Sequence, residues 1–83
     1  MKNLAQSQGV DGARAWFAAL LWRAFPGRSE REVAVKAARV LGVSSRQVQN
    51  WLRGENDASL RHVVAVLVIA GAEVVLTRIE GQG

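Results

Sequence analysis

The chain has 83 residues, a length that allows one small domain with a small core. Hydrophobic residues make up 49% of it, enough for a globular domain and too many for a disordered one. The absence of cysteine excludes disulfides, thiol catalysis and cysteine-based zinc sites, and it suits a cytoplasmic location. The formal net charge of +4 favours an acidic partner such as nucleic acid, but a small excess of arginine is also common on protein surfaces.

The first ten residues are rich in Asn, Gln, Ser and Gly and show no hydrophobic period, so we predict a flexible tail over residues 1–10. We expect no signal peptide, because no basic segment followed by an apolar one opens the chain. The longest apolar run, residues 63–72, is too short to span a bilayer, so we also expect no membrane association.

A first helix is predicted over residues 12–25, with Asp11 as its N-cap and Pro26 as its stop. Its apolar stripe comprises Trp16, Phe17, Leu20, Leu21 and Ala24. Trp22 lies about 140° round the helix from Phe17 and does not fit this stripe. It lies flat on the surface, is tucked under the Pro26 turn, or forms part of a protein interface, where Trp is enriched.

A second helix is predicted from Glu30 to Leu41, because Ser29 and Glu32 have the spacing of a capping box. The apolar positions that we expect to face the core are Val33, Ala34, Ala37, Ala38 and Leu41. The basic side chains expected on the outside are Arg31, Lys36 and Arg39.

Gly42 follows at the position where a left-handed backbone is least costly for glycine, and Val43 fills the corner between two helices. Ser44 and Gln47 form a second capping box, which predicts a third helix over residues 45–53. Its expected buried side chains are Val48, Trp51 and Leu52. Its expected outward side chains are Ser45, Arg46, Gln49, Asn50 and Arg53.

A fourth helix is predicted over residues 60–70, capped by Ser59 or Asp57 and ended by Gly71. It is rich in valine, a poor helix former, but the capping residues and the glycine favour helix over strand. The side chains that we expect to be buried are Leu60, Val63, Val64, Leu67 and Val68.

From residue 75 the sequence alternates, with Val75, Thr77 and Ile79 on one side, which predicts a short strand. No other stretch offers a partner strand, so we expect pairing with the same strand of a second copy, giving a homodimer. The alternative is a frayed tail. The predicted fold is therefore mainly α: a four-helix helix-turn-helix domain over residues 11–71, with a C-terminal strand and dimerisation segment over residues 72–83.

The run VKAARVLGVSSRQVQNWLRGEND, followed by a capped apolar helix and AGAEVVLTRI, resembles the lambda-repressor/Cro-like (XRE) helix-turn-helix family. The resemblance covers residues 29–70. Counted from Ala34 as the first motif position, Ala38 stands where the motif has a small residue and Gly42 where it has the turn glycine. The GAEVVL segment is similar to that of members that dimerise through an added β-ribbon. Small regulators of this sort resemble those encoded on phages and mobile elements.

The resemblance implies that residues 45–53 form a recognition helix that enters the major groove of double-stranded DNA. It places base-reading roles on Ser45, Arg46, Gln49 and Asn50. Arginine can pair bidentately with guanine, and Gln or Asn can pair with adenine. It places phosphate contacts on Arg28, Arg31, Arg39 and Arg53, with backbone N–H donors at Ser44. The same outward set could also be an ordinary solvated face.

Two functions remain open from the sequence. The first is a dimeric, sequence-specific transcriptional regulator that represses its target. The second is an antiactivator, a protein-interaction module that inhibits a transcription factor through surfaces such as Trp22. An antitoxin ranks last, because no toxin-binding extension is visible. His62 is the only histidine, and no catalytic constellation accompanies it, so we expect neither an enzyme nor a metal or other cofactor.

Overall fold

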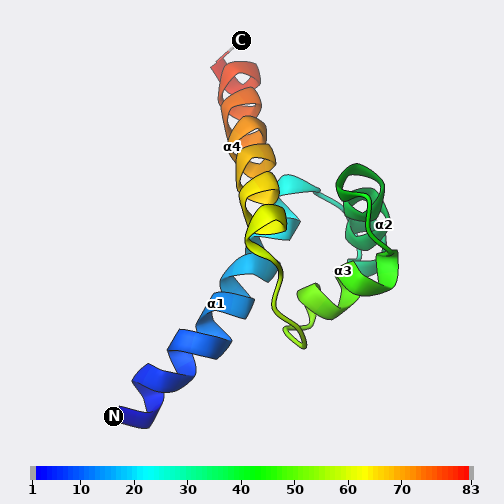
Figure 1. The fold of residues 1–83 in the computed structure, drawn as a ribbon. Helices are drawn as coiled ribbons and strands as arrows, with labels where there is room; N and C mark the ends of the chain where they lie inside the picture. Colours follow the sequence, from blue (N-terminus) through cyan, green and yellow to red (C-terminus); the bar gives the residue numbers. More distant parts are fainter. Residues whose placement is uncertain (1, 83) are drawn as a thin grey trace.

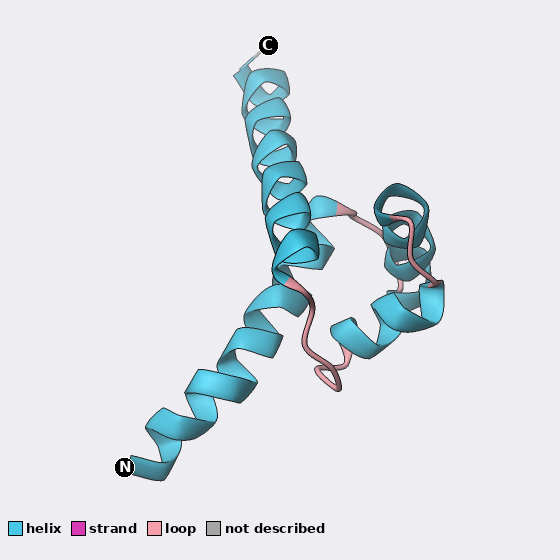
Figure 2. Ribbon diagram, viewed as in Figure 1, coloured by secondary structure: helices cyan, strands magenta, loops and turns pink. Residues whose placement is uncertain are grey.

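The computed structural model describes residues 2–82 of the chain, with side chains from residue 12 to residue 73. These residues form four helices: α1 (Lys2–Ala24), α2 (Glu30–Leu41), α3 (Ser45–Leu52) and α4 (Leu60–Gln82). Loops join the helices, and the described residues contain no strand (Figure 2). The predicted mainly helical, four-helix domain is confirmed at this level.

The two long helices, α1 and α4, organise the fold (Figure 1). The C-terminal part of α1 packs beside the N-terminal part of α4, and the free ends of the two helices point to opposite ends of the molecule. Helices α2 and α3 pack together on one side of this pair. Because α1 contacts all three other helices, its apolar stripe is the centre of the core.

The core joins residues from all four helices. The buried hydrophobic residues are Phe17, Leu20, Leu21, Ala24, Phe25, Val33, Ala34, Ala37, Val48, Trp51, Val66 and Ala70. The rings of Phe17 and Trp51 meet edge to face with centroids 5.5 Å apart, which fixes α3 against α1. Burial of a large apolar side chain stabilises a fold by about 1.5–3 kcal/mol, so this small set supplies most of the driving force.

Helix α1 starts at Lys2 instead of at the predicted Gly12, so it also covers most of the segment that we expected to be a flexible tail. Asp11 therefore lies inside the helix and is not its N-cap. Residues 2–24 contain no proline, and each residue added to an existing helix gains one backbone hydrogen bond. Glycine inside a helix costs only about 1 kcal/mol, which does not force a stop.

Helix α4 buries a different face from the one that we predicted. Val66 and Ala70 are buried and Val63 is half-buried, whereas Leu60, Val64, Leu67 and Val68 are exposed. The prediction was wrong because residues 62–72 contain no acidic, Lys or Arg residue, so no charged position marked the solvent side. An apolar stripe can be assigned from sequence only when polar residues mark the opposite face.

The strand predicted over residues 75–80 is not confirmed, since α4 continues through this segment to Gln82. Gly71 was expected to end the helix but lies within it, and a Cβ atom there would meet nothing within 4 Å. A lone strand without a partner would leave its backbone groups unpaired, whereas a helix pairs them within the segment. The side chains of Val75, Thr77 and Ile79 lie outside the described residues.

Candidate nucleic-acid interface

The turn between α2 and α3 has the geometry that its sequence predicts. Gly42 adopts φ 71° and ψ 32°, the left-handed conformation, and its N–H donates to the Ala38 carbonyl at 3.0 Å. The N–H of Val43 donates to the same carbonyl at 3.2 Å, and the Val43 side chain packs against the core. The turn is therefore fixed by its backbone hydrogen bonds and by the packing of the Val43 side chain. We refer to residues 28–53 as the α2–α3 unit.

Both helices of the α2–α3 unit are capped by the predicted serine, which directly precedes the first helical residue. Ser29 Oγ accepts a hydrogen bond from the Glu32 N–H at 3.1 Å, and Ser44 Oγ accepts one from the Gln47 N–H at 3.0 Å. The Glu32 carboxylate reaches back to the N–H of Arg28 at 3.4 Å, one residue before the expected Ser29. The Ser44 hydroxyl therefore caps the N-terminus of α3.

Helix α3 is held by two buried side chains, Val48 and Trp51, with Leu52 packed beside them. Its opposite side is open: Ser45, Arg46 and Arg53 are exposed, while Gln49 and Asn50 are half-buried. Among the described residues, Arg46 makes no ion pair or side-chain hydrogen bond. The open side of α3 therefore presents the hydroxyl of Ser45, the guanidinium of Arg46 and the amides of Gln49 and Asn50.

The predicted phosphate contacts lie on both helices of the unit. Arg31 and Arg39 line one open pocket of about 420 Å³ on α2, together with Lys36 and Val35. Arg28 is exposed just before the helix. Lys36 Nζ donates to the Pro26 carbonyl at 2.6 Å and lies 3.4 Å from the Glu32 carboxylate, so its charge is partly satisfied within the chain.

Arg53, by contrast, is already paired. Its Nε donates to Glu30 Oε1 at 3.0 Å, joining the C-terminal end of α3 to the first turn of α2. The two side chains are 55% and 38% exposed, so the pair is accessible to solvent and to competing anions. The structure thus pairs Arg53 with Glu30, an acidic residue that the sequence pattern did not link to it.

The α2–α3 unit holds the whole net charge of the chain. It holds six of the eleven Lys and Arg residues and two of the seven acidic residues, a net +4. The remainder of the chain has five of each and is neutral. A positive potential confined to one structural unit concentrates anions at that unit.

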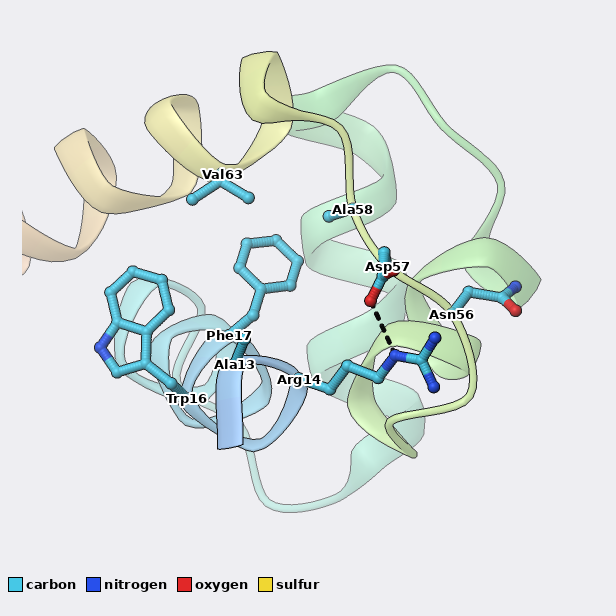
Figure 3. A pocket seen from close by; sticks show the side chains of 8 residues that line it. All are labelled: Ala13, Arg14, Trp16, Phe17, Asn56, Asp57, Ala58 and Val63. Carbon is cyan, nitrogen blue, oxygen red and sulfur yellow. Dashed lines mark hydrogen bonds and ion pairs between the residues drawn. The ribbon is translucent and has the colours of Figure 1, made fainter. Parts of the chain in front are cut away.

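A second ion pair fixes the loop that follows α3. Arg14 Nε on α1 donates to Asp57 Oδ1 at 2.7 Å (Figure 3). Arg14 Nη1 also donates to the Gly54 carbonyl at 3.5 Å. The hydrogen bond from Arg14, and the attraction of its positive charge, lower the pKa of Asp57. Asp57 was expected as a possible cap of α4, but it anchors the loop to α1 instead. The other candidate, Ser59, has its hydroxyl 2.8 Å from His62 Nδ1.

Beside this ion pair lies an apolar pocket of about 420 Å³ between α1 and α4. Figure 3 shows Phe17 of α1 beneath Val63 of α4, with the Trp16 ring on one side and the Arg14–Asp57 pair on the other. Trp16 was predicted to be buried with Phe17, but it is 51% exposed. Its polar lining residues are the paired Arg14 and Asp57 together with Asn56.

Trp22 is 39% exposed, so it lies off the buried stripe as its helical position predicts. Trp22 and Trp16 are on different sides of α1, about 120° apart at the usual helical spacing. Trp22 is the candidate for contact with another protein. The proposed roles of Val75, Thr77 and Ile79 in protein interaction fall on side chains outside the described residues.

No three His, Asp or Glu side chains gather into a possible metal site among the residues searched, which are those that the structure describes. His62 instead packs its ring 5.3 Å from that of Trp51. Within the same described part of the chain, no helix is both long enough and apolar enough to cross a membrane.

Comparisons of the chain with protein-family models, with curated proteins and with solved structures find no match. The class of protein is therefore defined by its fold alone, a small, mainly helical domain of four helices.

Proposed function

We propose that this chain binds double-stranded DNA through α3 and acts as a sequence-specific transcriptional regulator. The observation that carries the proposal is the confinement of the whole net charge to the α2–α3 unit, around a helix whose open side presents Arg46, Gln49 and Asn50. Positive charge supplies affinity for phosphate, and Arg, Gln and Asn are the side chains that pair bidentately with bases.

The roles of the individual residues follow from their exposure. Ser45 and Arg46 are exposed at the start of α3, the end of a recognition helix that contacts base edges. Gln49 and Asn50 follow one turn later. The basic residues flanking them would contact phosphates: Arg28, Arg31, Arg39 and Arg53. The first N–H groups of α3, beside the Ser44 cap, add donors for a phosphate.

A selection of random-sequence duplexes with the purified full chain tests the proposal. We expect enrichment of one motif, and affinity for it that falls steeply as salt rises, because bound phosphates release counterions. Arg46→Ala and Gln49→Ala should each reduce discrimination between the selected site and a scrambled one by about 1–3 kcal/mol. Arg23→Ala is the matched control, since Arg23 is exposed on α1 outside the α2–α3 unit.

Two results would refute the proposal: no enriched motif, or unchanged discrimination by both Arg46→Ala and Gln49→Ala. An effect of Arg23→Ala as large as that of Arg46→Ala would point to general electrostatic attraction without reading by α3.

Exposed tryptophans support a second candidate, an antiactivator that binds a transcription factor. Trp22 is 39% exposed, and Trp is the residue most enriched at binding hot spots. In this case crosslinking and mass spectrometry in cells should find one transcription factor on Trp22, and Trp22→Ala should abolish the contact. Trp16→Ala is the matched control, because Trp16 is also exposed on α1 but on a different side. A transcription factor that still crosslinks to Trp22→Ala would exclude this surface.

A further inference from the structure

A pocket of about 490 Å³ lies between the turn that joins α2 to α3 and the first turns of α4. Residues 40–43 line it from the end of α2 and the turn, and Arg61, His62 and Ala65 line it from α4. We call it the turn pocket. No residue of α3 lines it, so it is separate from the helix that we propose to read DNA. Its volume lies within the range of about 300–1,000 Å³ that small-molecule sites occupy.

The α4 end of the turn pocket provides hydrogen-bond donors. Arg61 is exposed and makes no ion pair or side-chain hydrogen bond among the described residues. Its guanidinium can donate two parallel N–H groups to one carboxylate. His62 packs its ring 5.3 Å from that of buried Trp51, and its Nδ1 lies 2.8 Å from the Ser59 hydroxyl. When this hydroxyl donates to Nδ1, the imidazole hydrogen is on Nε2, which then becomes a second donor.

The opposite end of the turn pocket, formed by residues 40–43, is apolar. Val40 is 62% exposed, and Leu41 and Val43 are half-buried because one side of each packs against the core. An apolar ligand group that covered these side chains would remove apolar surface from water, which favours binding. Within the described part of the chain no Asp or Glu lines the pocket, so its lining contains no carboxylate that would repel an anion.

From this division of polarity we infer that the turn pocket binds a small organic acid, in which one carboxylate is joined to a short apolar group. The carboxylate pairs with Arg61 and accepts from His62, and the apolar group lies against residues 40–43. The last carbonyl groups of α2 would repel a negative charge at that end, so the ligand has one favourable orientation. An inorganic anion would leave the apolar end in water, and a neutral molecule would gain nothing from the Arg61 charge.

An NMR titration of the isotope-labelled full chain with sodium hexanoate, at constant pH and ionic strength, tests the inference. We expect saturable shifts of the backbone N–H signals of residues 40–43, Arg61 and His62. Hexanamide has the same apolar chain without the charge and should bind more weakly by about tenfold or more. Acetate has the charge without the chain and should also bind more weakly by about tenfold or more.

Substitutions at exposed positions test the two ends of the pocket without disturbing the core. Arg61→Gln should weaken hexanoate binding by about tenfold or more and leave hexanamide binding unchanged, because only the acid uses the guanidinium. Arg23→Gln is the matched control, since Arg23 is exposed on α1 and does not line the pocket. Val40→Ser should weaken hexanoate and hexanamide alike, by about twofold or more. Val35→Ser is its control, because Val35 is also an exposed valine on α2 but lies outside the pocket.

Any of four results would overturn the inference. Hexanoate gives no saturable shifts, or its shifts lie around the pocket between Trp16 and Val63 instead. Hexanoate binds no more tightly than hexanamide, or it binds Arg61→Gln as tightly as the wild type. A short peptide with blocked ends, in which an acidic residue follows a leucine, binds more tightly than hexanoate, in which case the occupant is a segment of a partner protein. The titration contains no DNA, so its failure leaves the proposed DNA binding untouched, and failure of the DNA selection leaves the turn pocket untouched.

Discussion

Arg53 at the end of α3 donates its Nε–H to Glu30 in the first turn of α2, across 3.0 Å. This pair connects the two ends of the α2–α3 unit that lie farthest apart along the sequence. Because it is partly exposed, it contributes little to stability, about 0–1 kcal/mol. Its larger consequence concerns binding, since Glu30 competes with any phosphate for the same guanidinium.

Glu30→Gln should increase the affinity of the chain for DNA by up to about fivefold at low salt, because a charge pair of this exposure is worth about 0.2–1 kcal/mol. Titration of a labelled duplex by fluorescence anisotropy measures the change. Glu55→Gln removes the same charge from an exposed position with no ion pair among the described residues, and it provides the control. A decrease in affinity on Glu30→Gln would mean that the pair holds Arg53 in its binding position.

Gly42→Ala should destabilise the fold by about 1–2 kcal/mol, because an L-residue is strained in the left-handed conformation at φ 71°. The free space around Gly42 does not change this expectation, since the strain is in the backbone. Gly71→Ala should stabilise the fold by up to about 1 kcal/mol, because Gly71 lies inside α4 with open space around it. Urea unfolding measures the change in the free energy of unfolding for each variant. If both changes had the same sign, either the end of α2 at Gly42 or the continuation of α4 through Gly71 would be wrong.

The register of α4 can be tested with two valines. Val66→Ala should lower the free energy of unfolding by about 2–3 kcal/mol, because Val66 is fully buried and its loss leaves a cavity. Val68→Ala should change it by less than about 0.5 kcal/mol at concentrations where the chain is monomeric. A larger loss for Val68→Ala than for Val66→Ala in denaturant titrations would show that α4 buries the face originally expected from the sequence.

The Arg14–Asp57 pair predicts a dependence of stability on pH. The folded chain lowers the pKa of Asp57, so the unfolded chain binds the proton more readily. The pair therefore stabilises the fold at pH values above the pKa of Asp57 in the unfolded chain. This stabilisation is lost as the pH falls through the lower pKa of Asp57 in the folded chain. We expect the wild type to lose this part of its stability as the pH falls, whereas Asp57→Asn has no such part to lose. Circular dichroism from neutral pH downward measures the acid unfolding of both. Identical acid transitions in wild type and Asp57→Asn would show that the pair does not persist in solution.

Local signals in the sequence determined the α2–α3 unit. The serine caps, the left-handed Gly42 and the apolar spacing of α2 and α3 act within a few residues, so their outcome could be predicted without knowing the rest of the fold. The exposed positions of Ser45 and Arg46 follow from the same spacing, and so does that of Trp22.

Only the tertiary structure decided the contacts between distant segments and the orientation of α4. The partners of Arg53 and Asp57 lie 23 and 43 residues away, a separation at which sequence spacing carries no information. Residues 62–72 of α4 contain no charged side chain, so their sequence allowed either face to be buried, and packing against α1 selected Val66 and Ala70. The sequence by itself determined where α3 begins, because caps and turns are local. The long-range packing decided which apolar face of α4 remained uncovered.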